Sequence, residues 1–286
     1  MADTKEYEKK TYNFDDDSLR NDIQKFLVGN DKYKTLISEL KNIEILISDF
    51  AFLSDGRNYL KFNNHLFSLQ KILISIEFTI SNVIACCYVG CIADANTLAR
   101  KFTDDLFFYL YILVYDTKSM QKEIKDAESN IESWVQNKLK DLDISKVLKS
   151  IGNSTILSDV VKKYNLENSF KKIGSRLNDF VHSNGQGFYN DNTAIVDTSK
   201  YLEQVKQLIG DVKYITITFF ILLSICCPCL IMSSDYVDFL EVGEMPPEGS
   251  QYLIAPFIAQ FIKNNYSLID QNCLNYLQDN TCMKFD

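Results

Sequence analysis

Apolar residues recur with the period of an amphipathic helix along most of this chain. Over residues 31–53, alternating spacings of four and three positions place five apolar side chains on one buried stripe: Leu36, Leu40, Ile43, Ile47 and Phe50. Ser54, Asp55 and Gly56 follow, and these residue types favour a turn. We therefore expect one long helix over this segment.

A second apolar stretch, residues 66–115, is too long for one typical helix. Gly90 is the expected break or point of close packing within this stretch. We therefore expect two helices, over about 64–89 and 92–116.

The rest of the chain predicts further helices joined by short connections. These are expected over about 118–150, 155–164, 168–182, from Thr198 onward, 247–264 and 266–279. Pro246 and Pro247 favour a helix start at this point, since proline is tolerated in the first turn. With only 4 Pro and 10 Gly, the chain lacks the turn residues that an all-β fold needs.

Together these elements predict an all-α protein, a helical bundle with a C-terminal helical extension. We expect residues 1–30 to form a polar N-terminal arm or short helix, residues 31–232 the bundle, and residues 233–286 the extension. Apolar residues make up 46% of the chain, which is enough for a packed core, and a charged fraction of 24% argues against global disorder.

The segment 214–232 has no charged residue over 19 positions, a length that could cross a bilayer. It also contains Thr216, Thr218, Ser224 and Pro228, and basic residues do not flank it on both sides, since Asp235 and Asp238 follow it. A helix that is apolar on all sides is equally typical of the centre of a large bundle. We favour this buried position, and so we do not expect a membrane partner.

Cysteine usage and the polar N-terminus predict a cytoplasmic protein. Six of the 8 cysteines lie in apolar runs, and the first ten residues lack the apolar core of a signal peptide. We expect reduced thiols and no metal, because the Cys226-Cys227-x-Cys229 sequence lies in an apolar run and only 2 His exist to complete a site. The net charge of −8 suits solubility and argues against an extended surface that coats nucleic acid.

Arginine is scarce, with four among the 30 basic residues: Arg20, Arg57, Arg100 and Arg176. The planar guanidinium group binds carboxylate and phosphate through paired hydrogen bonds that lysine cannot make. Arg100 precedes Asp104 by four positions, which predicts an ion pair along one helix.

The segment 170–187, FKKIGSRLNDFVHSNGQG, contains the residues best suited to chemistry. Its apolar stripe consists of Phe170, Ile173, Leu177, Phe180 and Val181. Arg176 and His182 lie near the end of this helix, and Asn184 with Gly185 is expected to terminate it. Six helical steps separate Arg176 from His182 by about 120°. A shared site therefore requires an unwound last turn or a second subunit.

The sequence Arg176-Leu-Asn-Asp-Phe-Val-His182 resembles the Arg-x(4–6)-His motif of the HEPN superfamily, whose members are small helical bundles. This resemblance implies a HEPN-like bundle over about residues 31–230. It also implies a metal-independent RNA endonuclease, acting as a bacterial toxin or phage-defence effector, in which two motifs face each other across a homodimer. The family often has a polar residue directly after the arginine; this chain has Leu177 there and Asn178 one position later.

The chemistry of this pair suits RNA cleavage, because RNA supplies its own nucleophile in the 2′-hydroxyl. His182 is expected to transfer the proton, and Arg176 to hold the phosphate oxygens as negative charge builds. Asn178 and Ser183 are expected to bind RNA or to orient the imidazole. The expected partners are RNA, a second copy of the chain, and an antitoxin or other defence-system protein; no cofactor is expected.

Two other interpretations stay open. In one, Arg176 pairs with a nearby carboxylate such as Asp179 and His182 caps carbonyl groups at the helix end, so that the protein is a non-catalytic helical interaction or regulatory protein of a defence system. In the other, residues 214–232 insert into a bilayer and the protein is a membrane-associated effector.

Overall fold

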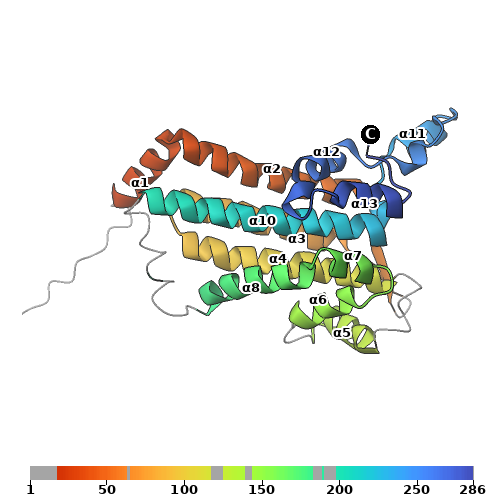
Figure 1. The fold of residues 1–286 in the computed structure, drawn as a ribbon, viewed down its shortest axis with the longest axis horizontal. Helices are drawn as coiled ribbons and strands as arrows, with labels where there is room; N and C mark the ends of the chain where they lie inside the picture. The colour runs from red at the N-terminus through yellow and green to blue at the C-terminus, as the bar shows by residue number, and fades with distance from the viewer. Residues whose placement is uncertain are drawn as a thin grey trace, which may run out of the picture.

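A computed structural model describes residues 18–62, 65–116, 125–138, 144–182, 189 and 198–285. These residues form an all-α bundle with one small hairpin, which confirms the predicted fold class (Figure 1). The α-helices are α1 Ser18–Gly29, α2 Asp31–Leu53, α3 Gln70–Tyr88, α4 Ile92–Asp116, α5 Lys125–Val135, α6 Ile144–Gly152, α7 Ser158–Lys163, α8 Leu166–Val181, α10 Thr198–Cys226, α11 Asp235–Glu241, α12 Pro256–Asn265 and α13 Cys273–Asn280. Short 3-10 turns are η2 Pro228–Leu230, η3 Ser250–Tyr252 and η4 Tyr266–Leu268.

Helix α2 has the bounds expected from its stripe, and the Asn30 side chain caps it by accepting a hydrogen bond from the Tyr33 N–H at 3.1 Å. Gly90 separates α3 from α4, as expected. Its φ of 83° is left-handed, and the Cys91 N–H donates to the Cys86 carbonyl at 2.9 Å, which is the closure typical of helix ends.

The first of these two helices starts later than expected, at Gln70 rather than near residue 64. The chain before it forms an antiparallel hairpin of β1 (Tyr59–Phe62) and β2 (His65–Ser68), in which Tyr59 pairs with Ser68. Four-residue strands are too short to produce a clear alternating pattern in the sequence.

The single helix expected over residues 118–150 is wrong. Helix α5 ends at Val135, where Asn137 takes a left-handed conformation with φ of 56°. The Lys138 N–H donates to the Ser133 carbonyl at 2.7 Å and closes the helix end. Asparagine tolerates this conformation better than most residues, so it can end a helix without a glycine. Helix α6 follows with an apolar stripe of its own, and the two stripes together look like one long helix in the sequence. The continuing periodicity therefore hid the break.

The C-terminal helices also begin later than predicted. Helix α12 starts with Pro256 and not at Pro247, which lies in the chain before η3. The final helix begins at Cys273, after the 3-10 turn that starts at Tyr266. A proline does lie in the first turn of α12, as proline geometry allows, but it is Pro256 and not the predicted Pro247.

Helices α4 and α10 form the centre of the bundle. Helix α10 packs against α2, α4, α12 and α13, and α4 also packs against α3, α6 and α8. Figure 1 shows these long helices side by side. Every residue from Ile215 to Ser224 is buried. The hydroxyls of Thr216, Thr218 and Ser224 donate to the carbonyls four residues earlier, so these buried hydroxyl groups are hydrogen-bonded.

Two helices of the described chain are long and apolar enough to cross a membrane by length and composition, α3 and α10. Within α10, 78% of the apolar window is buried inside the protein, compared with 39% in α3. The structure therefore buries most of the helical part of the run 214–232 inside the bundle.

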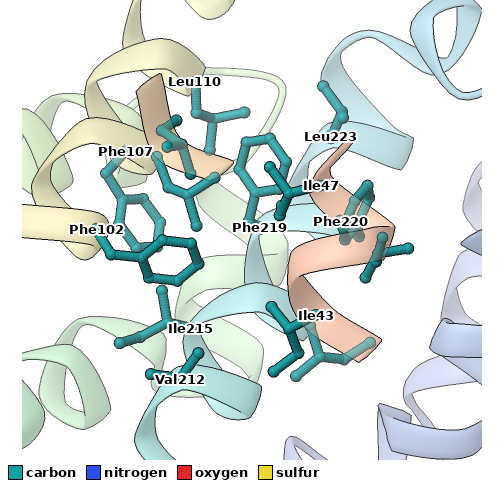
Figure 2. Packing of buried hydrophobic residues seen from close by; sticks show 14 of the residues in the cluster. Ile43, Ile47, Phe102, Phe107, Leu110, Val212, Ile215, Phe219, Phe220 and Leu223 are labelled. Atoms are coloured by element: carbon teal, nitrogen blue, oxygen red, sulfur yellow. The ribbon is translucent and has the colours of Figure 1, made fainter. Parts of the chain in front are cut away.

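Aromatic rings fill the space between α2, α4 and α10. The Phe50 ring lies edge-on to Tyr109, Phe219 and Phe220, with centroid distances of 6.4, 6.0 and 5.4 Å. Figure 2 shows Phe219 beside Ile47 in this cluster. All these rings are fully buried, so the cluster joins three helices that are distant in the sequence.

Replacement of Phe50 by Ala is expected to lower the free energy of unfolding by about 3–5 kcal/mol, because it leaves a cavity among three rings. Phe52 of the same helix is 83% exposed, so Phe52→Ala should change the stability by less than about 0.5 kcal/mol. Urea unfolding followed by circular dichroism tests both. Equal losses in the two variants would contradict the described core.

Candidate functional site

Helix α8 presents the candidate residues and is held in place by its apolar face. Phe170, Ile173 and Leu177 are buried, and the Phe170 ring lies edge-on to Phe107 of α4 at 4.5 Å. The buried stripe is shorter than the predicted one, because the helix extends beyond its packing partners. Val181 is 43% exposed, so the last turn of α8 lies at the surface.

Arg176 forms an ion pair with Asp211 of α10. Its Nε–H donates to Asp211 Oδ2 at 3.0 Å, and its Nη2 contacts Oδ1. Asp211 is buried, and the Gln207 side chain also donates to Oδ1, at 3.1 Å. An ion pair of Arg176 is part of one open interpretation, and the structure contains such a pair, but with Asp211, which lies 35 positions away on another helix, in place of Asp179.

This pairing orients the guanidinium group without using all of its donors. A guanidinium has five N–H groups, and the side-on contact with Asp211 engages Nε and Nη2. The Arg176 side chain is 38% exposed, so its remaining donors can reach a ligand at the surface. Burial raises the pKa of Asp211, and the hydrogen bond and charge of Arg176 act in the opposite direction.

His182 lies at the C-terminal end of α8 with an exposed side chain. Its backbone N–H donates to the Asn178 carbonyl at 3.0 Å and so closes the last helical turn. Asn178 is half-buried and lies on the same side of the helix, about 40° away by helical geometry. Ser183 lies outside the described residues.

The structure does not bring Arg176 and His182 of one chain together. Arg176 faces α10, whereas Asn178 lines a groove next to α4 and α6. This agrees with the separation of about 120° expected for six steps of a straight helix. Both side chains are nevertheless accessible in the C-terminal half of α8, since Arg176 is half-exposed and His182 is exposed.

The groove beside Asn178 has a volume of about 360 Å³ and contains a site residue that the sequence did not identify, Arg100. The expected ion pair of Arg100 with Asp104 is present, with 3.2 Å between Nη2 and Oδ1. Burial raises the pKa of Asp104 to about 6, although the Arg100 charge opposes this. Gly174 in the middle of α8 was the available signal, since its missing side chain leaves room for Arg100.

Several of the cysteines are in surroundings that disfavour reactivity. All eight are free thiols, and burial raises the pKa of Cys226 well above its ordinary value and that of Cys229 to a smaller degree. Protonated thiols are poor nucleophiles and poor metal ligands. Within the described ranges, no group of three or more His, Cys, Asp or Glu side chains could hold a metal ion.

Arg176→Ala is expected to lower the free energy of unfolding by about 2 kcal/mol at pH 7.5, because it leaves the Asp211 carboxylate buried without its cation. A raised folded-state pKa means that the cost of ionised Asp211 is present above that pKa and is relieved as the pH falls towards the unfolded value of about 3.9. The loss should therefore be smaller at pH 5.

The double variant Arg176→Ala/Asp211→Asn should recover more than half of this stability at pH 7.5, since it removes the charge that Arg176 neutralises. Urea unfolding of the wild type and both variants at the two pH values provides the measurement. A double variant less stable than Arg176→Ala would show that the ion pair is not the stabilising contact.

Comparison of the chain with protein-family models, with curated proteins and with solved structures finds no significant match. The resemblance to the HEPN superfamily therefore depends on the seven-residue motif from Arg176 to His182 alone.

Proposed function

We propose that the protein is a metal-independent RNA endonuclease of the HEPN type that acts as a homodimer. The main observation in support is the state of Arg176, a half-exposed guanidinium oriented by the buried carboxylate of Asp211. It lies on the same helix that ends with an exposed His182. A role as a bacterial toxin or phage-defence effector follows from the motif resemblance.

The proposed reaction uses the substrate's own nucleophile. The ribose 2′-oxygen forms a bond to the adjacent phosphorus while the bond from phosphorus to the 5′-oxygen breaks. One general base removes the 2′-hydroxyl proton, and one general acid protonates the departing 5′-oxygen. The products are a 2′,3′-cyclic phosphate and a 5′-hydroxyl, and the free N–H donors of Arg176 bind the phosphate oxygens as charge develops.

The need for both a base and an acid supports the homodimer. Each chain has one His182, and two copies would provide one group for each proton transfer. A second copy also fits the helix geometry, because six helical steps separate Arg176 and His182 of a single chain by about 120° around α8. Asn178, one turn before His182, is assigned to orient the imidazole or to bind RNA.

A non-catalytic regulatory protein is the second candidate. The observation that favours it is the same ion pair, which connects α8 to the central helix α10 and gives Arg176 a structural role. In this alternative the exposed end of α8 binds a partner protein of a defence system. The membrane-associated effector is less consistent with the burial of residues 215–224 on all sides.

RNA cleavage by the purified protein and growth arrest on expression in bacteria test the proposal. His182→Ala should abolish both, because it removes the proton-transferring group. The matched control is His65→Ala, which removes the only other histidine of the chain and should leave cleavage unchanged. Arg176→Ala should reduce cleavage by at least about a hundredfold, the usual effect of a lost charge-stabilising donor.

Loss of folding must be separated from loss of chemistry in the Arg176 variant. The double variant Arg176→Ala/Asp211→Asn regains stability but lacks the guanidinium, so it should stay inactive. A folded wild type that cuts no RNA, or a His182→Ala protein as active as His65→Ala, would refute the ribonuclease and favour the regulatory protein.

A further inference from the structure

One face of α8 presents four polar side chains in a row. Lys171, Ser175, Asn178 and His182 follow one another at spacings of four, three and four positions, which places them on the same side of a helix. The row spans eleven positions, or about 16 Å along the helix axis. The first three line the groove between α4, α6 and α8, and the fourth follows at its end.

Arg100 adds a second cation to this groove. A Cβ atom at position 174 would lie only 3.0 Å from Arg100 Nη1, so the guanidinium passes directly beneath Gly174. The Arg100 side chain is 15% exposed, and its one charged partner in the described part of the chain is Asp104. One contact leaves most of its five N–H groups without a protein acceptor among these residues.

The charges and donors of the groove suit an anion. Lys171 and Arg100 provide positive charge, and Ser175 and Asn178 provide further hydrogen-bond donors. Two carboxylates lie beside the cations, Glu167 in the groove lining and Asp104 paired with Arg100, so the groove favours an anion through its hydrogen-bond donors more than through net charge. A partly buried guanidinium with free donors binds phosphate in preference to a neutral group, because each hydrogen bond is then charge-assisted. The row is also linear, which fits a chain of phosphates better than a single ion.

We infer that this α8 groove binds the phosphodiester backbone of a single RNA strand and guides it to His182, with Arg100 and Lys171 holding phosphates upstream of the cleavage point. The inference rests on the proposed ribonuclease function and adds the path of its substrate. Arg176 of the same chain faces the other side of the helix, so in the proposed dimer the guanidinium at the cleavage point comes from the second copy.

Binding of a fluorescently labelled single-stranded RNA that is 2′-O-methylated at every ribose tests this directly. The methyl group blocks the nucleophile, so the probe binds without being cut. Lys171→Glu should weaken binding roughly tenfold at low salt and reduce the salt dependence, because it replaces a phosphate contact by a repulsive charge. The matched control is Lys172→Glu, the same charge change on the same helix at an exposed residue outside the groove, which should have less than about a threefold effect.

Gly174→Ala provides a second pair of variants. The added methyl group should push the Arg100 guanidinium slightly out of its position and weaken binding of the probe, whereas Gly210→Ala, also in a helix but with open space around the new atom, should bind as the wild type. Thermal melting of both proteins shows whether Gly174→Ala still folds.

Stronger loss of binding in Lys171→Glu than in Lys172→Glu, together with weaker binding in Gly174→Ala, supports the groove. Equal binding by Lys171→Glu and Lys172→Glu overturns it. If His182→Ala abolishes cleavage in that case, the ribonuclease proposal stands and only the substrate path is wrong. A wild type that neither binds the probe nor cuts RNA refutes both.

Discussion

The absence of a polar face on the middle of α10 is the constraint on which the bundle depends. From Ile215 to Ser224 every side chain must be shielded from water, and a single neighbouring helix covers only one side. Helices α2, α4, α12 and α13 surround it. The hydroxyl groups within this stretch donate hydrogen bonds to carbonyl groups of their own helix, so they can be buried without polar partners on the neighbouring helices.

The candidate site begins where this apolar stretch ends. Asp211 lies one turn before Ile215, at the boundary of the buried stretch, and it needs a cation because burial disfavours its charge. Arg176 supplies that cation from α8 and is thereby held in one orientation. The same helix presents His182 at its exposed end and the polar groove on its other flank. The apolar face of α8 holds the helix against α4, and the pairing with Asp211 fixes the orientation of Arg176 on it.

Much of this arrangement could be predicted from local pattern. The stripe of α2, the break at Gly90 and the placement of Arg176 and His182 near the end of α8 all depend on spacings within one segment of the chain. The helix end near Asn137 could not be predicted, because the left-handed asparagine ends the helix while the apolar residues keep their helical spacing. The partner of Arg176 and the approach of Arg100 to Gly174 depend on packing between helices that are far apart in the sequence. Residue spacing within one helix carries no information about such contacts.

The chemical nature of the RNA ends tests the central claim most directly. Purified protein is incubated with single-stranded RNA in the presence of a metal chelator, and the termini of any fragments are identified by mass spectrometry. Attack by the ribose hydroxyl predicts 2′,3′-cyclic phosphate and 5′-hydroxyl ends, and no cleavage where that hydroxyl is methylated. Fragments with 3′-hydroxyl and 5′-phosphate ends, or intact RNA under all conditions, would contradict a ribonuclease in which His182 and Arg176 act on the substrate's own nucleophile.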